Sequence, residues 1–146
     1  MSEILAPETI ELKATLGSRD EAIRRAGQLL VDNGHVDDLY IDSMFEREKS
    51  VSTFMGNAVA IPHGTGDSKQ WVKRSGLSVI TVPEGVEYGD GNVANLIVGI
   101  AGKGDEHLEI LSKIAIIFSD DEAVARLLAA GTAGELHTLL SEGNEP

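Results

Sequence analysis

The sequence predicts an α/β fold in which a mixed β-sheet is flanked by helices on both sides. Segments with helical apolar spacing precede, interrupt and follow short apolar segments typical of strands. One of these, residues 96–100, is uniformly apolar, as expected of a central strand covered on both faces. The 146 residues are the size of one domain. We therefore expect a single domain over residues 1–146, with frayed ends at about 1–4 and 141–146.

The first two helices are predicted from capping signals and apolar periodicity. Ser18 and Glu21 form a Ser-x-x-Glu cap, in which the serine oxygen accepts from a free amide and the glutamate reaches back. Apolar residues then recur at helical spacing, and Asn33-Gly34 ends the helix. A second helix is expected over about residues 37–48.

Three helices are predicted in the C-terminal third. One begins near Glu106, with an inward face formed by Leu108, Leu111, Ala115 and Phe118. Two short helices follow, and the Ser/Thr-x-x-Glu pattern predicts their starts at Ser119–Glu122 and Thr132–Glu135.

The predicted strands are short apolar segments bounded by turn residues, namely 10–12, 58–61, 77–82 and 96–100. Pro62 ends the second of them, and the turn Pro83-Glu84-Gly85 is expected to end the third. Helices alternating with such strands favour one layered α/β structure.

Composition excludes several classes of function. A formal net charge of −12 argues against a nucleic-acid binder and against docking on anionic lipid. The absence of cysteine excludes disulfide scaffolds, thiol nucleophiles and Cys-based zinc sites. The N-terminus lacks a basic leader, and no apolar segment approaches the roughly 20 residues that span a bilayer. We therefore expect a cytoplasmic protein that does not enter the membrane.

His63 is the first candidate functional residue, because it directly follows an apolar strand segment. It stands in the sequence Pro-His-Gly-Thr-Gly, and strand ends of α/β sheets commonly carry functional groups. The backbone at Gly64 can pass close to a ligand, and Thr65 adds a hydroxyl. Such a turn can hold a phosphate beside the imidazole, although glycine-rich turns also occur for purely structural reasons.

His107 and Arg47 are the next candidates. His107 opens a predicted helix just after the central strand, so its ring can face His63 across the sheet edge. Arg47 lies near the end of the second predicted helix, where a cation stabilises the helix dipole and a guanidinium can also clamp a phosphate.

Two chemistries fit this histidine pair. In the first, both imidazoles ligate a metal for hydrolysis, with Asp67 or Glu106 as a third ligand. In the second, His63 is a nucleophile that takes a phosphoryl group, since a neutral imidazole is available at cytoplasmic pH. The added negative charge then requires close partners, for which Arg47, His107 and the amides of residues 64–66 are available.

The segment 45–65, and above all its Gly-Asn-Ala-Val-Ala-Ile-Pro-His-Gly-Thr sequence, resembles the active-site segment of enzyme IIA of the mannitol/fructose class. These are proteins of the bacterial phosphoenolpyruvate-dependent sugar phosphotransferase system. The resemblance extends to residues 20–30, 83–86 and 96–108, covers about Leu5 to Leu140, and is strongest to the mannitol branch.

This resemblance implies a phosphotransferase component without a cofactor or metal. His63 would accept a phosphoryl group from the phosphorylated protein HPr and pass it to enzyme IIB on a separate chain. His107 and Arg47 match active-site positions that stabilise the phosphate, and Asn57, Gly64 and Thr65 fall within the substrate-binding segment. Some members carry glutamate in place of Asn57. A regulatory enzyme IIA of the nitrogen type, or one of the fructose type acting through protein binding, is the alternative.

Overall fold

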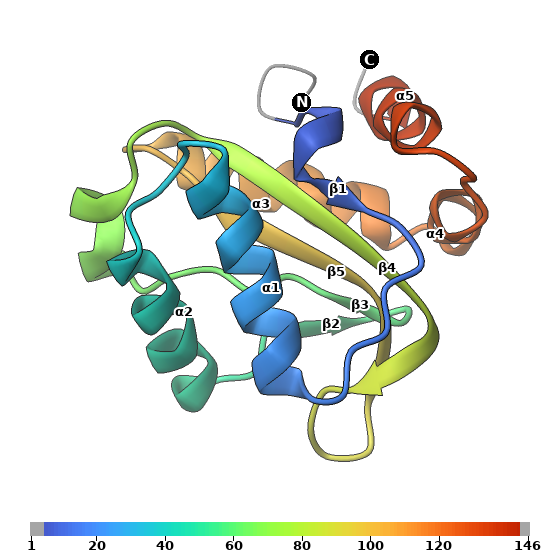
Figure 1. Ribbon diagram of the computed structural model, residues 1–146, viewed down its shortest axis with the longest axis horizontal. Coiled ribbons are helices and arrows are strands. Elements are labelled where there is room, and N and C mark those ends of the chain that lie inside the picture. Colours follow the sequence, from blue (N-terminus) through green and yellow to red (C-terminus); the bar gives the residue numbers. More distant parts are fainter. Residues whose placement is uncertain (1–4, 144–146) are drawn as a thin grey trace.

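The computed structural model describes residues 5–143 and has the predicted α/β architecture, with a five-stranded mixed sheet between two layers of helices (Figure 1). Fraying was expected at 1–4 and 141–146; residues 141–143 instead form the end of the last helix, and residues 1–4 and 144–146 lie outside the described residues. Within the described part of the chain, no helix has the length and apolar character needed to cross a bilayer.

The sheet has the strand order β1-β4-β5-β3-β2. β1 pairs parallel with β4 and β3 pairs parallel with β5, whereas the pairs β4–β5 and β2–β3 are antiparallel. The central position of β5 explains its uniformly apolar sequence, because both of its faces are covered. The strands are β1 (Ile10–Glu11), β2 (Phe54–Gly56), β3 (Val59–Ala60), β4 (Gly76–Glu87) and β5 (Val93–Ala101).

The helices cover both faces of this sheet, as predicted. α1 (Arg19–Asp32) and α2 (Leu39–Ser50) enclose one core, which includes Ile23, Met44, Ile80 and Ile97. The opposite face carries a second core, which includes Val79, Val98, Ile114 and Leu136, beneath α3 (Glu106–Phe118), α4 (Asp121–Leu128) and α5 (Ala133–Gly143). Two 3₁₀ turns, η1 (Pro7–Thr9) and η2 (Gly66–Trp71), complete the chain.

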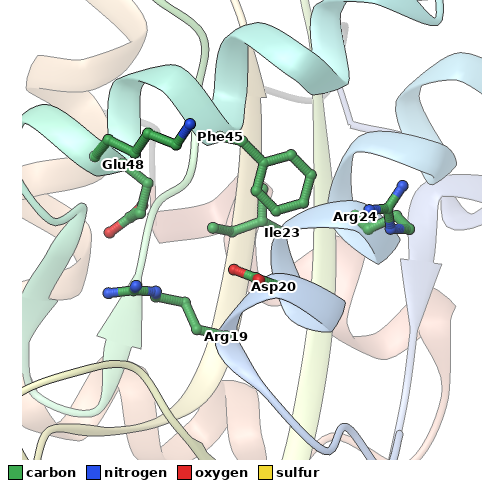
Figure 2. Close-up of a pocket in the computed structure, with 7 residues that line it drawn as sticks. Arg19, Asp20, Ile23, Arg24, Phe45 and Glu48 are labelled. Atoms are coloured by element: carbon green, nitrogen blue, oxygen red, sulfur yellow. The ribbon is translucent and has the colours of Figure 1, made fainter.

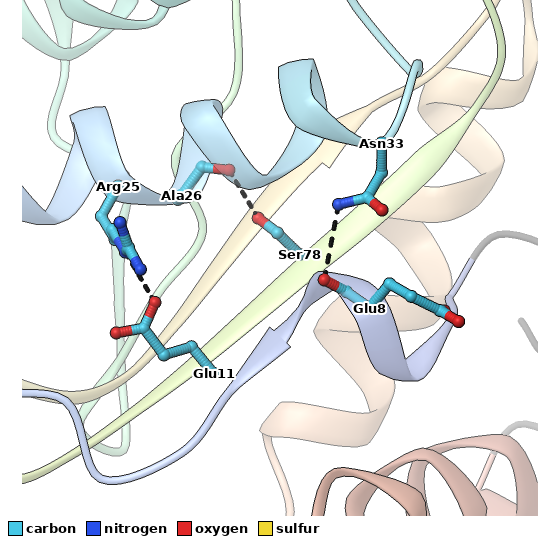
Figure 3. A network of polar contacts seen from close by, with 6 residues as sticks. All are labelled: Glu8, Glu11, Arg25, Ala26, Asn33 and Ser78. Carbon is cyan, nitrogen blue, oxygen red and sulfur yellow. Dashed lines mark hydrogen bonds and ion pairs between the residues drawn. The ribbon is translucent and has the colours of Figure 1, made fainter.

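Polar contacts attach α1 to the strands beneath it (Figure 3). The buried Ser78 hydroxyl of β4 donates to the Ala26 carbonyl at 2.8 Å, and Arg25 pairs with Glu11 of β1 at 2.6 Å. The start of the helix is capped as predicted, since the Ser18 hydroxyl accepts from the Glu21 amide at 3.2 Å.

The turn predicted at Pro83-Glu84-Gly85 is wrong, because β4 continues through it to Glu87. The pairing of β4 with β5 shifts register between Thr81 and Val86, which makes these residues a bulge inside a long strand. The Asn95 side-chain amide donates to the carbonyls of Val82 at 3.0 Å and Pro83 at 3.3 Å, so the extra residues retain hydrogen-bond partners.

Two details of the C-terminal helices also differ from the prediction. The inward face of α3 is formed by Ile110, Ile114, Ile117 and Phe118, whereas Leu108 is 71% exposed. The apolar residues of α3 extend around more of the helix than one face, so periodicity alone did not distinguish the buried side. The cap of α4 is the Asp120 carboxylate and not Ser119, while the cap predicted at Thr132 is confirmed.

Candidate functional site

His63 lies on a continuation of β3 along the central strand. Its bridge to Ile100 keeps the register of the pairs Val59–Leu96 and Ala60–Ile97. Alternate strand residues face the same side, and Val59 belongs to the core beneath α3. The side chain of His63 is therefore directed toward the α3 layer, where it is 6% exposed.

Hydrogen bonding selects one tautomer of His63. Its Nδ1 lies 2.8 Å from the carbonyl oxygen of Ile61, which can only accept, so Nδ1 carries the proton. The lone pair of the neutral ring is consequently on Nε2. Burial, and to a smaller extent the charge of Arg47, lower the pKa of His63 from 6.5, while the Ile61 carbonyl and Glu48 act in the opposite direction. The imidazole is therefore neutral and nucleophilic at pH 7.

His107 lies beside this ring, as the sequence predicts from the two strand ends. The ring centroids of His63 and His107 are 5.3 Å apart, with an interplanar angle of 56°. Gly102 packs directly against the backbone of His107, where a Cβ on residue 102 would overlap the His107 Cα. The Ser75 hydroxyl accepts from the Lys103 amide and donates to Glu106, both at 2.9 Å, and thereby holds the start of α3.

Arg47 reaches the site from the last turn of α2. Its guanidinium donates to the Val51 carbonyl at 2.6 Å, which satisfies the end of the helix. The same positive charge contributes to the lowered pKa of His63. The role of Arg47 at the helix end is therefore confirmed, whereas its role as a phosphate clamp stays a prediction.

The loop after His63 is packed against α2. The Gly64 amide donates to the Tyr40 hydroxyl at 2.9 Å, and this hydroxyl donates to the Ile100 carbonyl at 2.7 Å. Burial raises the pKa of Tyr40 to about 12, so it stays a donor. The Gly64 amide, expected among the groups facing a phosphate, therefore already has a partner. Thr65 is half-buried and lines a cavity of about 230 Å³ with Ser43 and Trp71.

Asn57 is not brought to the histidines. It lies in the turn that precedes β3, whereas His63 lies beyond the other end of that strand. Its side-chain amide donates to the Phe118 carbonyl at 2.9 Å. Asn57 and Ala58 have φ of 52° and 64°, the left-handed values of a type I′ turn between β2 and β3. The structure thus gives Asn57 a role in the hairpin, and its place in the substrate-binding segment stays a prediction.

This turn yields a stability prediction. Ala58→Gly is expected to raise the free energy of unfolding by about 0.5–1 kcal/mol, because alanine is strained in the left-handed region and glycine is not. Urea denaturation measures the change. Ala125→Gly, the same substitution on the exposed side of α4, is the control and should lower the free energy of unfolding by about 1 kcal/mol. A destabilised Ala58→Gly protein would contradict the turn assignment.

Glu48 is a buried carboxylate near the site that sequence reasoning did not select. It lines a cavity of about 430 Å³ bordered by the start of α1 and the end of α2 (Figure 2), and its charge acts on His63. Arg19, Asp20 and Phe45 line the same cavity. Glu48 follows Ile41 and Met44 at helical spacing, and this periodicity was the available signal that it faces inward.

No group of three or more His, Asp or Glu side chains that could hold a metal ion occurs in the part of the chain that the structure describes. The geometry consists instead of two adjacent imidazoles, one held in a defined tautomer, with a cation nearby. Such a site can form a covalent bond at Nε2 and stabilise negative charge there.

Comparison with known proteins agrees with this geometry. Residues 3–143 match the family model of the phosphoenolpyruvate-dependent sugar phosphotransferase system, EIIA 2. The chain is 57% identical over 141 residues to the mannitol-specific phosphotransferase enzyme IIA component of Geobacillus stearothermophilus, covering 97% of each chain. It is 54% identical over 142 residues to the corresponding Bacillus subtilis protein, covering 97% of this chain and 99% of the relative.

Solved structures with the same fold include the complex of enzyme IIAMTL and phosphorylated enzyme IIBMTL from Escherichia coli. The TM-score is 0.88 at 31% identity, covering 95% of this chain and 99% of that one. The nitrogen regulatory protein IIA-Ntr from Neisseria meningitidis has a TM-score of 0.82 at 32% identity, covering 95% of this chain and 97% of that one.

Proposed function

Because the chain belongs to the phosphoenolpyruvate-dependent sugar phosphotransferase system EIIA 2 family, we propose that it carries a phosphoryl group on Nε2 of His63. It is an enzyme IIA of the mannitol/fructose class, a phosphocarrier of that system. The observation that supports His63 as the carrier is its buried imidazole, in which the Ile61 carbonyl holds the Nδ1 proton and leaves the Nε2 lone pair available.

The transfer is a displacement at phosphorus. The Nε2 lone pair forms a bond to the phosphorus of a donor phosphohistidine, and the donor's N–P bond breaks with its electron pair returning to the donor imidazole. The Nδ1 proton of His63 stays on the hydrogen bond to Ile61 throughout. Passing the group on reverses the same step, with a nucleophile of the next carrier attacking phosphorus.

Two neighbours are suited to stabilise the transferred group. His107, whose ring centroid is 5.3 Å from that of His63, can donate to a phosphoryl oxygen. The charge of Arg47 acts on His63, and its guanidinium can pair with the same oxygens. Gly64 fixes the loop through its bond to Tyr40, while Thr65 offers a hydroxyl at the rim.

The donor and acceptor follow from the family and from charge. A chain with net charge −12 does not attract free anions through its overall field, so the phosphoryl group is best delivered by a protein with a basic face, HPr. The acceptor is an enzyme IIB, and mannitol is the sugar, because the two curated relatives named above are mannitol-specific. We place this exchange in the cytoplasm, with residues 1–146 acting as one enzyme IIA domain.

The test is a reconstituted relay. With phosphoenolpyruvate, enzyme I and HPr, the chain should gain the mass of one phosphoryl group in an acid-labile form. Addition of a mannitol-class enzyme IIB should remove it. A chain that is phosphorylated but serves no enzyme IIB would instead support the regulatory alternative, which the 32% identical nitrogen regulatory structure represents. A chain that gains no phosphoryl group would contradict the proposal.

The lowered pKa of His63 predicts the pH dependence of loading. Because the pKa of His63 is below the ordinary value of 6.5, the imidazole stays neutral at a pH where an ordinary histidine is already protonated. The single-turnover rate of loading should therefore fall only at a more acidic pH. Arg47→Gln removes a charge that lowers this pKa and should move the acid limb of the rate to higher pH. The original chain and Arg47→Gln are measured with the same donor, so titration of the donor affects both rate profiles equally. Coincident acid limbs would refute the assigned effect of Arg47.

A further inference from the structure

The carboxylate of Glu48 is buried beneath the site, where it is 7% exposed. Its Oε2 accepts from the Thr53 amide at 2.8 Å, and its Oε1 accepts from the Thr53 hydroxyl at 2.6 Å. The Tyr88 hydroxyl adds a longer contact to Oε1 at 3.3 Å. Burying a charge is unfavourable unless hydrogen bonds compensate for the lost water, and Thr53 supplies two of them.

The hydrogen bonds continue from Thr53 to the nucleophile. The Thr53 carbonyl accepts from the Ile61 amide at 3.0 Å, and the Ile61 carbonyl accepts from Nδ1 of His63 at 2.8 Å. The bond between Thr53 and Ile61 extends the antiparallel pairing of β2 with β3, in which Phe54 is opposite Ala60. An uninterrupted series of contacts thus connects a buried carboxylate on α2 to the imidazole.

We propose that Glu48 and Thr53 are positioning residues for His63, acting through the Ile61 carbonyl. This inference rests on the proposed function of His63 as the phosphoryl carrier. The Glu48 carboxylate holds Thr53 through two hydrogen bonds, and the Thr53 carbonyl holds Ile61 through its amide. The Ile61 carbonyl then sets both the tautomer and the orientation of the His63 ring. At metal sites, the groups that hydrogen-bond the second ring nitrogen of a ligating histidine contribute substantially to activity, because they orient the ring. A nucleophilic histidine needs its ring oriented in the same way.

Electrostatics gives Glu48 a second effect on the same ring. Its negative charge raises the pKa of His63, whereas Arg47, the preceding residue, lowers it. The groups identified as acting on the imidazole therefore comprise one anion and one cation from the end of α2, together with the Ile61 carbonyl and burial. The Glu48 carboxylate is held in place by its hydrogen bonds to Thr53, which also begin the series of contacts to the His63 ring.

Thr53→Val tests the positioning role, because valine keeps the branched shape and the amide but lacks the hydroxyl. The single-turnover rate of loading from phospho-HPr should fall about tenfold with the half-saturating HPr concentration unchanged, since only the ring is affected. Thr53→Ser restores the hydroxyl and should return the rate to within about twofold of the original. Nitrogen-15 NMR of the unphosphorylated protein should show a mixture of His63 tautomers in Thr53→Val and one tautomer in Thr53→Ser.

Ser78→Ala is the matched control. It also removes a buried hydroxyl, one that donates to the Ala26 carbonyl on the α1 side of the sheet, and should leave loading and tautomer unchanged. Equal losses of rate in Thr53→Val and Ser78→Ala would overturn the proposal, as would an unchanged tautomer in Thr53→Val.

Glu48→Gln keeps the shape of the side chain and removes its charge, so it remains informative if Thr53→Val does not fold. The pKa of His63, followed by NMR, should decrease in this variant, and an unchanged pKa would contradict the role of Glu48. The tautomer and the pKa are measured without a donor. A wild-type chain that is not phosphorylated would therefore refute the proposed function. The tautomer and pKa of His63 would still show whether Glu48 and Thr53 position its ring.

Discussion

Replacing His63 by alanine is expected to abolish phosphorylation of the chain by phospho-HPr. The substitution removes Nε2, the atom proposed to bond to phosphorus. The measurement is the intact mass after incubation with the donor system, which should show no gain beyond background.

His137→Ala is the control for this loss. His137 lies on α5, and its Nε2 contacts the Leu5 carbonyl at 2.8 Å. It is therefore on a different element from His63 and His107. It should be phosphorylated as fully as the original chain. Loading that persists in His63→Ala but disappears in His107→Ala would transfer the carrier role to the second imidazole.

The second large effect is expected at Gly64. In Gly64→Ala the new Cβ would lie 2.4 Å from Ser68 Oγ, 2.6 Å from Ser43 Oγ and 2.7 Å from a ring carbon of Tyr40. All three neighbours are buried, so the loop must move away from α2 and break the bond from the Gly64 amide to Tyr40. Overpacking of this kind costs about 1–3 kcal/mol, to which the lost hydrogen bond adds about 1 kcal/mol.

We therefore expect Gly64→Ala to lower the free energy of unfolding by about 2–4 kcal/mol and to reduce loading, because His63 directly precedes the displaced residue. Urea denaturation and the mass assay measure the two effects. Gly17→Ala is the control, since its nearest contact is 4.0 Å away, and it should stay within about 0.5 kcal/mol of the original. A Gly64→Ala protein with unchanged stability would show that this packing is not tight in solution.

Much of the fold was predictable because its signals are local. The cap at Ser18, the helical spacing after it and the uniformly apolar residues 96–100 each act within a few residues, and all three predictions are confirmed. The short β2 was missed, and β4 was ended too early at Pro83. β2 has only three residues, which is too short for a clear alternation of side chains. The continuation of β4 depends on its pairing with β5, as in the bonds from Asn95 to the bulge.

The candidate site divides in the same way. The placement of His63 and His107 after two strands was enough to predict that they meet, because β3 and β5 are parallel neighbours and end at one edge. Asn57 was grouped with His63 because it is close in sequence, but the two residues lie at opposite ends of β3. Nothing local indicated that Thr53 would contact Glu48 and Ile61.

By itself the sequence determined the class of fold, the two histidines and the net charge of −12. These depend on periodicity, on residue type and on net charge, which need no coordinates. Only the tertiary structure decided which nitrogen of His63 is free, which glycine amide is already bonded, and that a buried Glu48 supports the ring through Thr53 and Ile61. Each of those depends on hydrogen bonds between segments that meet only when the sheet and α2 pack together.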